Sequence, residues 1–438
     1  MVSVKSPSSS YSRKMFLKKL GAGILSVSAF EQAKPQNKLP QNKLDEPTFS
    51  NSSSDPIPRS PLNASTEVSE SKFFPAPESP DRRMGYAIVG LGHLALGEVM
   101  PAFSACKYSK PVALVSGDSK KANIVADQYG IDHKNIYNYE NFDLIADNKE
   151  IEAVYIILPN NMHHEFTIRA AKAGKHVLCE KPMANSVEEC EEMIEACKKA
   201  NRKLMIAYRI QYEPYNTIIK EWIRSKQYGT AKVLEFFNGQ NIGDPSQWRL
   251  KKKMAGGGSL VDVGIYCLNT CRFLLGEEPE AVTASIYTTP GDERFGEVEE
   301  SVLFQIHFPS GSRANCITTY GTHMCRRYRV FTDKGAWYGL DPAFSYKGLQ
   351  AEVSQAKGKL EWKQHPWMYE KNQFALEIDH LSQCIAKNKK PYTPGEEGLQ
   401  DQKIMDAIYK SARENTLVNL DKYTTLDTFR GDKPAEDE

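Results

Sequence analysis

Three observations predict an α/β fold. Its first domain carries a parallel, doubly wound sheet, and its second, α+β domain carries a large, mostly antiparallel open sheet. Residues 86–89 form an apolar run that leads directly into a glycine-rich turn. Between residues 85 and 207, short apolar runs alternate with helical patterns, as in parallel strands joined by crossover helices. After residue 208, β-branched and aromatic runs follow one another with turns between them, which indicates antiparallel strands.

The composition sets limits on the class of protein. A length of 438 residues suggests more than one domain, and a hydrophobic content of 40% is enough for a sizeable core. The formal net charge of +1 does not favour nucleic acid as a partner. The nine cysteines are an odd number without a C-x-x-C pair, so we expect neither a disulfide framework nor a zinc site.

The first thirty residues have the layout of an export signal. Residues 12–19 are basic, and residues 20–30 are apolar, rich in small side chains and too short to span a membrane as a mature helix. The order is similar to a twin-arginine signal with Lys14 in place of the second arginine. We therefore expect a periplasmic protein that is exported folded. The alternative is a basic amphipathic start of a cytoplasmic protein.

The next segment, up to residue 83, is rich in proline, serine and asparagine and has few large apolar residues. Such a composition cannot bury a core of its own. We interpret it as an extended arm, with a disordered spacer as the alternative. The predicted organisation is an export signal over 1–30, an arm over 31–83, a first domain over 84–207, a second domain over 208–420 and a tail over 421–438.

Periodicity locates the elements of both domains. The predicted strands of the first domain are Tyr86–Val89, Val112–Val115, Ala153–Leu158, His176–Cys179 and Lys203–Ala207, with helices over 163–173 and 187–200. The predicted strands of the second domain are Val233–Phe237, Ala281–Tyr287, Val302–Phe308, Ala314–Tyr320 and Tyr328–Thr332, with helices over 259–275 and 399–415. We expect the last helix to pack back on the first domain.

The first apolar run ends in Gly90-Leu91-Gly92-His93-Leu94-Ala95, which has the pattern G-x-G-x-x-A. In this pattern the first glycine allows a tight turn, the second lets the backbone approach a phosphate, and the small third residue keeps the helix close to the strand. The helix N-terminus adds free N–H groups and partial positive charge. The motif predicts a Rossmann-type dinucleotide-binding domain. Taken alone, it is equally typical of a plain strand-to-helix turn.

The end of the second predicted strand bears on the choice of dinucleotide. NAD-binding domains usually carry an acidic residue there to hold the ribose 2′-hydroxyl. This chain has Ser116, with Lys120 and Lys121 close behind it. A hydroxyl with a cation suits a 2′-phosphate, so the sequence favours NADP. Asp118 is compatible with NAD, which remains the alternative cofactor. The structural alternative is that these residues are simply the solvated start of a helix.

A lysine follows the fourth predicted strand, in the sequence Glu180-Lys181-Pro182. Ligands bind in the crevice outside the carboxyl ends of parallel strands, and a lysine at this place points into that crevice. Lys181 is therefore a candidate catalytic residue, although Lys-Pro at a strand end is by itself more often structural.

A third motif starts at Gly256-Gly257-Gly258 and continues into the predicted helix. Asp262 and Tyr266 lie four residues apart in it and so share one helix face. Together with Lys181 they form a candidate acid/base group. The structural alternatives are a capping box between Ser259 and Asp262 and a core position for Tyr266.

With these motifs in order, residues 82–419 resemble the glucose–fructose oxidoreductase / inositol dehydrogenase / rhizopine catabolism (Gfo/Idh/MocA) family. Longer runs resemble its glucose–fructose oxidoreductase branch in particular. These are residues 83–92, 153–160, 173–183, 208–209, 247–249 and 394–398. Many relatives carry histidine where this chain has Tyr266, so the tyrosine also favours that branch.

The resemblance implies an NADP-dependent enzyme that oxidises a glucose-like aldose at C1 to the lactone. The hydride then passes through tightly bound NADP to fructose, which becomes sorbitol. Tyr266 would be the general acid/base, Lys181 would favour its phenolate, and Asp262 would hold Lys181 or a sugar hydroxyl. The alternatives are an aldose dehydrogenase that releases NADPH, an aldose–aldose oxidoreductase, and a sensor that binds NADP or sugar without turnover.

The resemblance also implies the residues around each ligand. The expected cofactor residues are Gly90, Leu91, Gly92, His93, Leu94, Ser116, Lys121, Leu158, Asn160, His163, Glu180, Lys181, Arg209, Trp248 and Arg249. The expected sugar residues are Lys181, Asp262, Tyr266 and Tyr346. We expect small-molecule sugars as partners, no nucleic acid, no metal, no stable membrane span, and a homodimer or homotetramer formed through the open C-terminal sheet.

Overall fold

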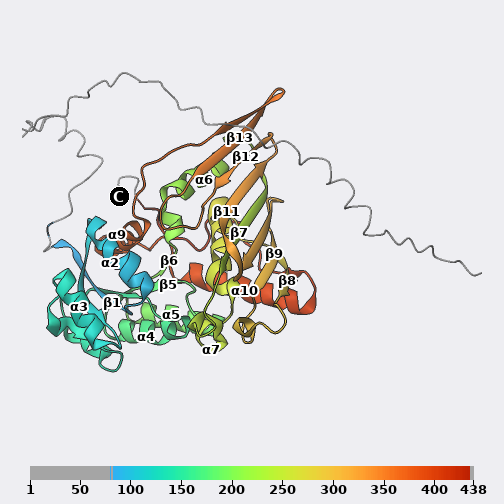
Figure 1. Cartoon of the computed structure of the whole chain (residues 1–438). Helices are drawn as coiled ribbons and strands as arrows, with labels where there is room; N and C mark the ends of the chain where they lie inside the picture. Colours follow the sequence, from blue (N-terminus) through green and yellow to red (C-terminus); the bar gives the residue numbers. More distant parts are fainter. Residues whose placement is uncertain (1–78, 80–81, 435–438) are drawn as a thin grey trace, which may run out of the picture. The chain divides into compact units, whose positions relative to one another are not determined.

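The computed structural model describes residue 79 and residues 82–434 (Figure 1). The predicted export signal and nearly all of the predicted arm lie outside the described residues. Within those residues, no helix has the length and apolar character needed to cross a membrane. The fold class predicted from the sequence is confirmed, because a parallel sheet comes first and a large, mostly antiparallel sheet follows.

The first sheet has six parallel strands in the order β3-β2-β1-β4-β5-β6. The strands are β1 (Met84–Val89), β2 (Ser109–Val115), β3 (Ile136–Tyr137), β4 (Ala153–Ile156), β5 (His176–Glu180) and β6 (Leu204–Ala207). This is the strand order of the Rossmann fold, in which the order reverses between β1 and β4. The reversal opens a crevice at the carboxyl ends of these strands.

Helices cover this sheet. They include α2 (Met100–Ala102), α3 (Ser119–Tyr129), α4 (His163–Lys172) and α5 (Val187–Lys199), together with α9 (Gln373–Ala386), which comes from the far end of the chain and packs on β2 and β5. The strands β1 and β4 are buried along their whole length, which is why each appears as a continuous apolar run in the sequence. The predicted helices 163–173 and 187–200 agree with α4 and α5 to one residue.

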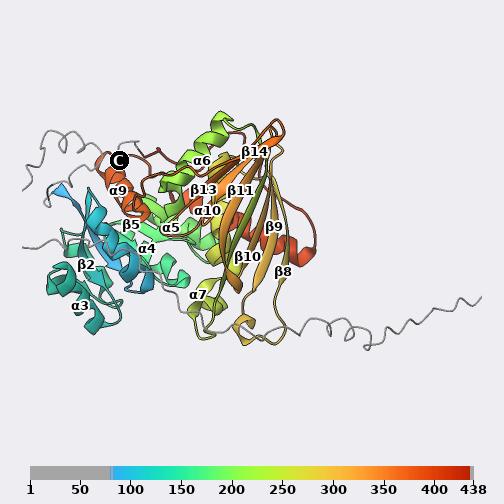
Figure 2. The ribbon, with the colours of Figure 1, turned by 45° about the horizontal axis from the view of Figure 1, so that its top comes forward.

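The second sheet has nine strands in the order β14-β13-β12-β11-β7-β10-β9-β8-β15 (Figure 2). They are β7 (Ala231–Asn241), β8 (Ala281–Tyr287), β9 (Ser301–His307), β10 (Arg313–Thr319), β11 (Gly321–Thr332), β12 (Ala336–Leu340), β13 (Ala351–Lys357), β14 (Leu360–Gln364) and β15 (Val418–Asn419). Every pair is antiparallel except β7 with β10. The five predicted strands are the central ones.

The sequence analysis did not predict β12 to β15. The two edge strands of the sheet explain this most clearly. Every residue of β14, at one edge, is exposed, and its side chains are mostly polar or charged. A strand without a buried face lacks the alternation that identifies strands in a sequence. β15 has only two residues and forms the opposite edge of the sheet.

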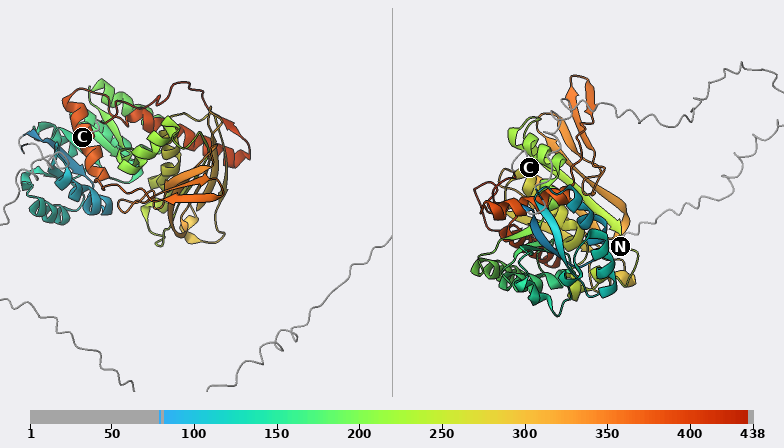
Figure 3. Two further views of the ribbon diagram at one scale, coloured as in Figure 1. Left: turned by 90° about the horizontal axis from the view of Figure 1, so that it is seen from above. Right: turned by 90° about the vertical axis from the view of Figure 1, so that its left-hand side faces the viewer.

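One face of the second sheet is covered by helices. α8 (Ile265–Leu275) packs on β7 and β10, α6 (Pro214–Ser225) packs on α8, and α10 (Gly395–Glu414) packs on β8. α10 also contacts α5 and β6 of the first domain. Figure 3 shows this helix, in red, crossing behind the strands of the second sheet. The two domains therefore share α10 as a common support.

α10 starts four residues before the predicted helix, at Gly395 instead of Leu399. A Cβ on Gly395 would lie 2.8 Å from the side chain of Ile194, and one on Gly398 would lie 2.9 Å from Met183. Both glycines thus allow the first turn of the helix to approach the first domain closely. Glycine has a low helix propensity, so the sequence pattern hid this turn.

The predicted helix 259–275 consists of a π-helical turn over Leu260–Gly264 followed by α8. Its start is capped by Glu299, whose carboxylate accepts hydrogen bonds from the Gly258 N–H (2.8 Å) and the Leu260 N–H (3.0 Å). The Ser259 hydroxyl makes no capping bond. The capping-box alternative for Asp262 is therefore wrong, and this carboxylate is available for other contacts.

The segment predicted as a tail folds back onto the second domain as far as it is described. Arg430 is buried, and its guanidinium lies 2.7 Å from Glu397 Oε1 and donates to Gln211 Oε1 at 3.1 Å. Arg272 of α8 joins the same cluster through Glu397 and Glu278. The end of the chain thus stabilises the base of α8, the helix that carries Tyr266.

Candidate active site

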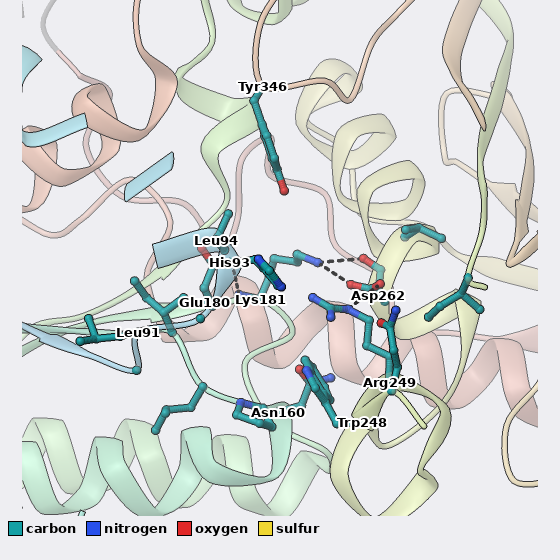
Figure 4. A pocket seen from close by; sticks show the side chains of 18 of the residues that line it. Leu91, His93, Leu94, Asn160, Glu180, Lys181, Trp248, Arg249, Asp262 and Tyr346 are labelled. Carbon is teal, nitrogen blue, oxygen red and sulfur yellow. Dashed lines mark hydrogen bonds and ion pairs between the residues drawn. The ribbon is translucent and has the colours of Figure 1, made fainter. Parts of the chain in front are cut away.

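A cleft of about 750 Å³ lies between the two domains. Its walls come from the loop after β1, the ends of β2, β4 and β5, the start of α8 and the end of β7 (Figure 4). All but one of the predicted site residues line it. These are Gly90, Leu91, Gly92, His93, Leu94, Ser116, Lys121, Leu158, Asn160, Glu180, Lys181, Arg209, Trp248, Arg249, Asp262, Tyr266 and Tyr346.

His163 is the exception, because it does not line the cleft, and its contact with the cofactor stays a prediction. Its side chain is buried, with Nδ1 2.8 Å from the Pro182 carbonyl oxygen and Nε2 2.9 Å from the Leu158 carbonyl oxygen. The ring therefore joins the loops that follow β4 and β5. It positions these loops and does not line the cleft.

The glycine-rich loop fits a dinucleotide pyrophosphate. Gly90 has φ +96°, and a Cβ there would lie 2.4 Å from the Ile157 carbonyl oxygen, so only glycine permits this turn. At Gly92 a Cβ would meet no protein atom within 4 Å, because that side of the backbone faces open space. Ala95 is fully buried against the sheet. This is the arrangement that lets a phosphate approach the backbone at a helix N-terminus.

The end of β2 forms the outer part of the cleft. Ser116 accepts a hydrogen bond from the Asp118 N–H at 3.1 Å, and the Asp118 carboxylate accepts one from the Lys121 N–H at 3.0 Å as the N-cap of α3. Asp118 is thus used for capping, while the Lys121 side chain is exposed at the cleft. A hydroxyl and a cation face the region where a ribose 2′-substituent would lie.

Asp262 is the centre of the polar network in the cleft (Figure 4). Its Oδ1 lies 3.2 Å from Lys181 Nζ, which also donates to the Asp262 backbone carbonyl at 2.8 Å. Its Oδ2 lies 3.2 Å from Arg249 Nε and accepts a hydrogen bond from the Tyr320 hydroxyl at 2.8 Å. Burial alone would raise the pKa of Asp262, but Lys181 and Arg249 outweigh it and lower the pKa to about 2.

This lowered pKa predicts a pH-dependent contribution to stability. A carboxyl whose pKa falls from 3.8 to about 2 on folding stabilises the protein above pH 4 by roughly 2 kcal/mol, and about half of this is lost by pH 3. Between pH 7 and pH 3, we expect the difference in unfolding free energy between the parent protein and Asp262→Asn to shrink by about half of this contribution of roughly 2 kcal/mol. Urea titrations at both pH values measure it. A difference independent of pH would contradict the ionised pairing.

Tyr266 lies between two cations. Lys181 Nζ is 4.7 Å from the centroid of its ring, and Arg209 Cζ is 5.0 Å from it. Burial would lower the pKa of Lys181, but Tyr266, Asp262 and Glu180 outweigh it and raise the pKa above its usual value. Lys181 thus stays an ammonium, and it lies beside the phenol ring of Tyr266.

Arg209 is fixed by the segment that carries Tyr346. Its guanidinium donates to the carbonyl oxygens of Phe344 (2.8 Å) and Ser345 (3.2 Å). The guanidinium carbon also lies 4.6 Å from the Tyr346 ring centroid. The loop after β12 is thereby held near Tyr266, with the centroid of the Phe344 ring 5.8 Å from that of the Tyr266 ring, and Tyr346 points into the cleft (Figure 4).

The sequence analysis missed several residues of the cleft. They include Tyr139, Asn238, Gln240, Asn241, Gln247, Arg326, Phe344 and Phe374. β7 is longer than predicted and extends to Asn241, so its end reaches the cleft. The run of amide side chains just beyond the predicted end of this strand was the available signal. Among the described residues, no group of histidine, cysteine or acidic side chains is placed to hold a metal ion.

Comparison with known families identifies the class of protein. Residues 84–208 match the family described as "Oxidoreductase family, NAD-binding Rossmann fold", and residues 217–338 match the "GFO/IDH/MocA C-terminal domain". The two matches together cover more than half of the chain. The chain therefore belongs to the GFO/IDH/MocA oxidoreductase family, as its motifs predicted.

Individual relatives are similar over most of the described residues. D-xylose 1-dehydrogenase [NADP(+)] of Haloarcula marismortui is 32% identical over 355 residues, covering 78% of this chain and 94% of that protein. The crystal structure of aldose-aldose oxidoreductase from Caulobacter crescentus, complexed with glycerol, has 47% identity and a TM-score of 0.74, covering 77% of this chain and all of that one. Levoglucosan dehydrogenase, with 22% identity and a TM-score of 0.68, shares the fold.

Proposed function

We propose that the protein is an NADP-dependent sugar oxidoreductase that transfers hydride from one sugar to another. Its donor is an aldose, which it oxidises at C1 to the lactone, and its acceptor is a second aldose. The observation that carries this proposal is the group of Tyr266, Lys181 and Asp262 in the same cleft as the glycine-rich loop. Hydride transfer to or from a sugar requires a proton-exchanging side chain beside a dinucleotide site.

Each residue of this group has its own role in the reaction. The phenolate of Tyr266 takes the proton from the anomeric hydroxyl while the C1–H bond breaks and the C1–O bond becomes a carbonyl. Bound NADP supplies the acceptor for the hydride. In the second half-reaction Tyr266 returns the same proton to the carbonyl oxygen of the acceptor sugar. Lys181 favours the phenolate, and Asp262 keeps Lys181 in place through two contacts.

The identity of the acceptor rests on the relatives. The Caulobacter protein, described as an aldose-aldose oxidoreductase, is 47% identical to this chain over its whole length. This identity favours an aldose as the acceptor over fructose, our first prediction. Fructose is the second candidate acceptor, because residues 173–183 and 394–398 resemble the glucose–fructose branch. An aldose dehydrogenase that exchanges free NADP is the further alternative that the Haloarcula relative suggests.

Product analysis tests the proposed function. The purified protein is incubated with glucose or xylose without added cofactor, and the products are followed by NMR. We expect the lactone, or the aldonic acid formed from it, and the corresponding alditol in equal amounts. Sorbitol formed only when fructose is present would identify fructose as the acceptor. Turnover that requires added NADP would indicate a dehydrogenase, and no product under any of these conditions would overturn the proposal.

The preference for NADP has its own test at Lys121. We expect Lys121→Glu to weaken NADP binding by about 10- to 100-fold, the size of a lost hydrogen bond to a charged group, and to leave NAD binding almost unchanged. Isothermal titration with both nucleotides measures this. Lys120→Glu is the matched control, because Lys120 is equally exposed but does not line the cleft. Equal losses in the two variants, or for the two nucleotides, would contradict a 2′-phosphate site.

Two broader expectations belong to the same proposal. The export-signal layout of residues 1–30 supports a periplasmic location with NADP already tightly bound. Subunit association through the second sheet is supported by its open face, where Phe237, Ile317 and Leu303 form one row across β7, β10 and β9. Leu303 is 46% exposed there. Such an apolar row favours a homodimer or homotetramer.

A further inference from the structure

Two buried carboxyl groups share one hydroxyl group beneath the cleft. Glu180, at the end of β5, lines the cleft and is 8% exposed, while Glu377, on α9, is fully buried. The hydroxyl oxygen of Tyr155, a fully buried residue of β4, lies 2.9 Å from Glu180 Oε1 and 3.1 Å from Glu377 Oε1. The three side chains form a chain of hydrogen bonds from α9 to the floor of the cleft.

Counting protons in this chain limits its charge. The Tyr155 hydroxyl has one proton and can donate it to one carboxyl group only. An ionised carboxylate has no proton to donate. Both contacts are hydrogen bonds only if the other carboxyl group is protonated and donates to the tyrosine oxygen. The geometry therefore requires that at least one of the two carboxyl groups is a neutral carboxylic acid.

The surroundings of the two carboxyl groups indicate which one carries the proton. Glu180 accepts a second hydrogen bond, from the Lys181 N–H at 3.2 Å, and the positive charges of Lys181 and Arg209 act on it. Glu377 Oε2 is buried without any hydrogen-bond partner. Burial raises the pKa of both groups. For Glu377, burial and the charge of Glu180 raise the pKa well above its usual range. Tyr155 and Arg209 oppose this rise. Tyr212 is a further titratable group that acts with Glu377, and it is neutral because burial raises its pKa.

We propose that Glu377 holds the proton and donates it to Tyr155, which in turn donates to Glu180, so that Glu180 presents a fixed negative charge beside Lys181. Tyr155 and Glu377 are then positioning residues. The negative charge favours the ammonium of Lys181 and, on the proposed function, the positively charged oxidised form of NADP over the reduced form. This chain of hydrogen bonds also explains why the fully buried carboxyl group of Glu377 on α9 is tolerated.

Matched substitutions at both carboxyl groups test the assignment. Glu377→Gln keeps a donor for Tyr155 and should restore the turnover that Glu377→Leu loses, with the pH profile of the parent protein. Glu180→Gln removes the charge and should lower the affinity for NADP⁺ relative to NADPH by about tenfold, comparable to a lost hydrogen bond to a charged group. If Glu377→Gln lost turnover and Glu180→Gln left the affinity for NADP⁺ relative to NADPH unchanged, the proton would lie on Glu180 and the proposal would be overturned.

Infrared difference spectroscopy tests the same point without turnover. The spectrum of the parent protein minus that of Glu377→Gln should contain the carbonyl stretch of a protonated carboxylic acid, and the corresponding difference for Glu180→Gln should contain carboxylate bands instead. The absence of the carboxylic acid band from the first difference would overturn the assignment whatever the substrate. Failure to turn over any sugar, with both spectra as expected, would count against the proposed function alone.

Discussion

Replacing Tyr266 with phenylalanine is expected to lower turnover by about 10²- to 10⁴-fold, the range that general acid–base catalysis supplies, and to leave NADP bound. The substitution removes only the hydroxyl group that exchanges the proton. The ring and its contacts with Lys181 at 4.7 Å and Arg209 at 5.0 Å remain. Steady-state kinetics with an aldose pair, together with the nucleotide content of the purified variant, measure both parts.

Tyr346→Phe is the matched control for this substitution. Tyr346 also presents a phenol to the cleft and also contacts Arg209, but it comes from the loop after β12, and among the described residues its ring has no cation–π contact with Lys181 (Figure 4). We expect this variant to raise KM for the sugar more than it lowers kcat. Near-normal turnover in Tyr266→Phe, or the same loss of kcat in both variants, would show that Tyr266 is not the acid/base.

Replacing Lys181 with methionine is expected to have the next largest effect, a loss in kcat on the order of 10² at pH 7. Methionine fills similar space without the charge. The phenolate of Tyr266 then loses the ammonium above its ring, and Asp262 loses two of its contacts.

Arg249→Met separates this effect from a general loss of positive charge. Arg249 is the other cation paired with Asp262, at 3.2 Å, but it has no contact with the Tyr266 ring. We expect it to weaken NADP binding and to lower kcat less than Lys181→Met does. A parent-like kcat in Lys181→Met would show that Lys181 does not assist Tyr266.

The parts of the site that could be predicted from the sequence are those that local motifs encode. Gly90 and Gly92 form a cradle because a turn of that shape requires glycine, and this requirement is visible in a few neighbouring residues. Lys181 and Tyr266 follow from strand ends and helix spacing in the same way. The topology of a doubly wound sheet brings Lys181 to the same crevice as the glycine-rich loop, whereas Tyr266 comes from α8 of the second domain.

What could not be predicted depends on contacts between distant segments. Glu299 caps the helix of Tyr266 from 39 or more residues away. Glu377 reaches Tyr155 beneath the cleft because α9 packs on β5. His163 illustrates a different limit, since the family resemblance implied cofactor contact, whereas its ring turns inward to two carbonyl groups. No local pattern distinguishes these outcomes.

The most direct test of the central claim is the absorbance of the purified protein in the reduced-nicotinamide band, recorded without added cofactor. Adding an aldose should make the band rise, and adding an excess of a second aldose in its open-chain aldehyde form should make it fall again. The same additions to Tyr266→Phe should leave the band unchanged although NADP is present. A protein that contains no nicotinamide, or a parent protein whose band does not respond to any aldose, would contradict the account.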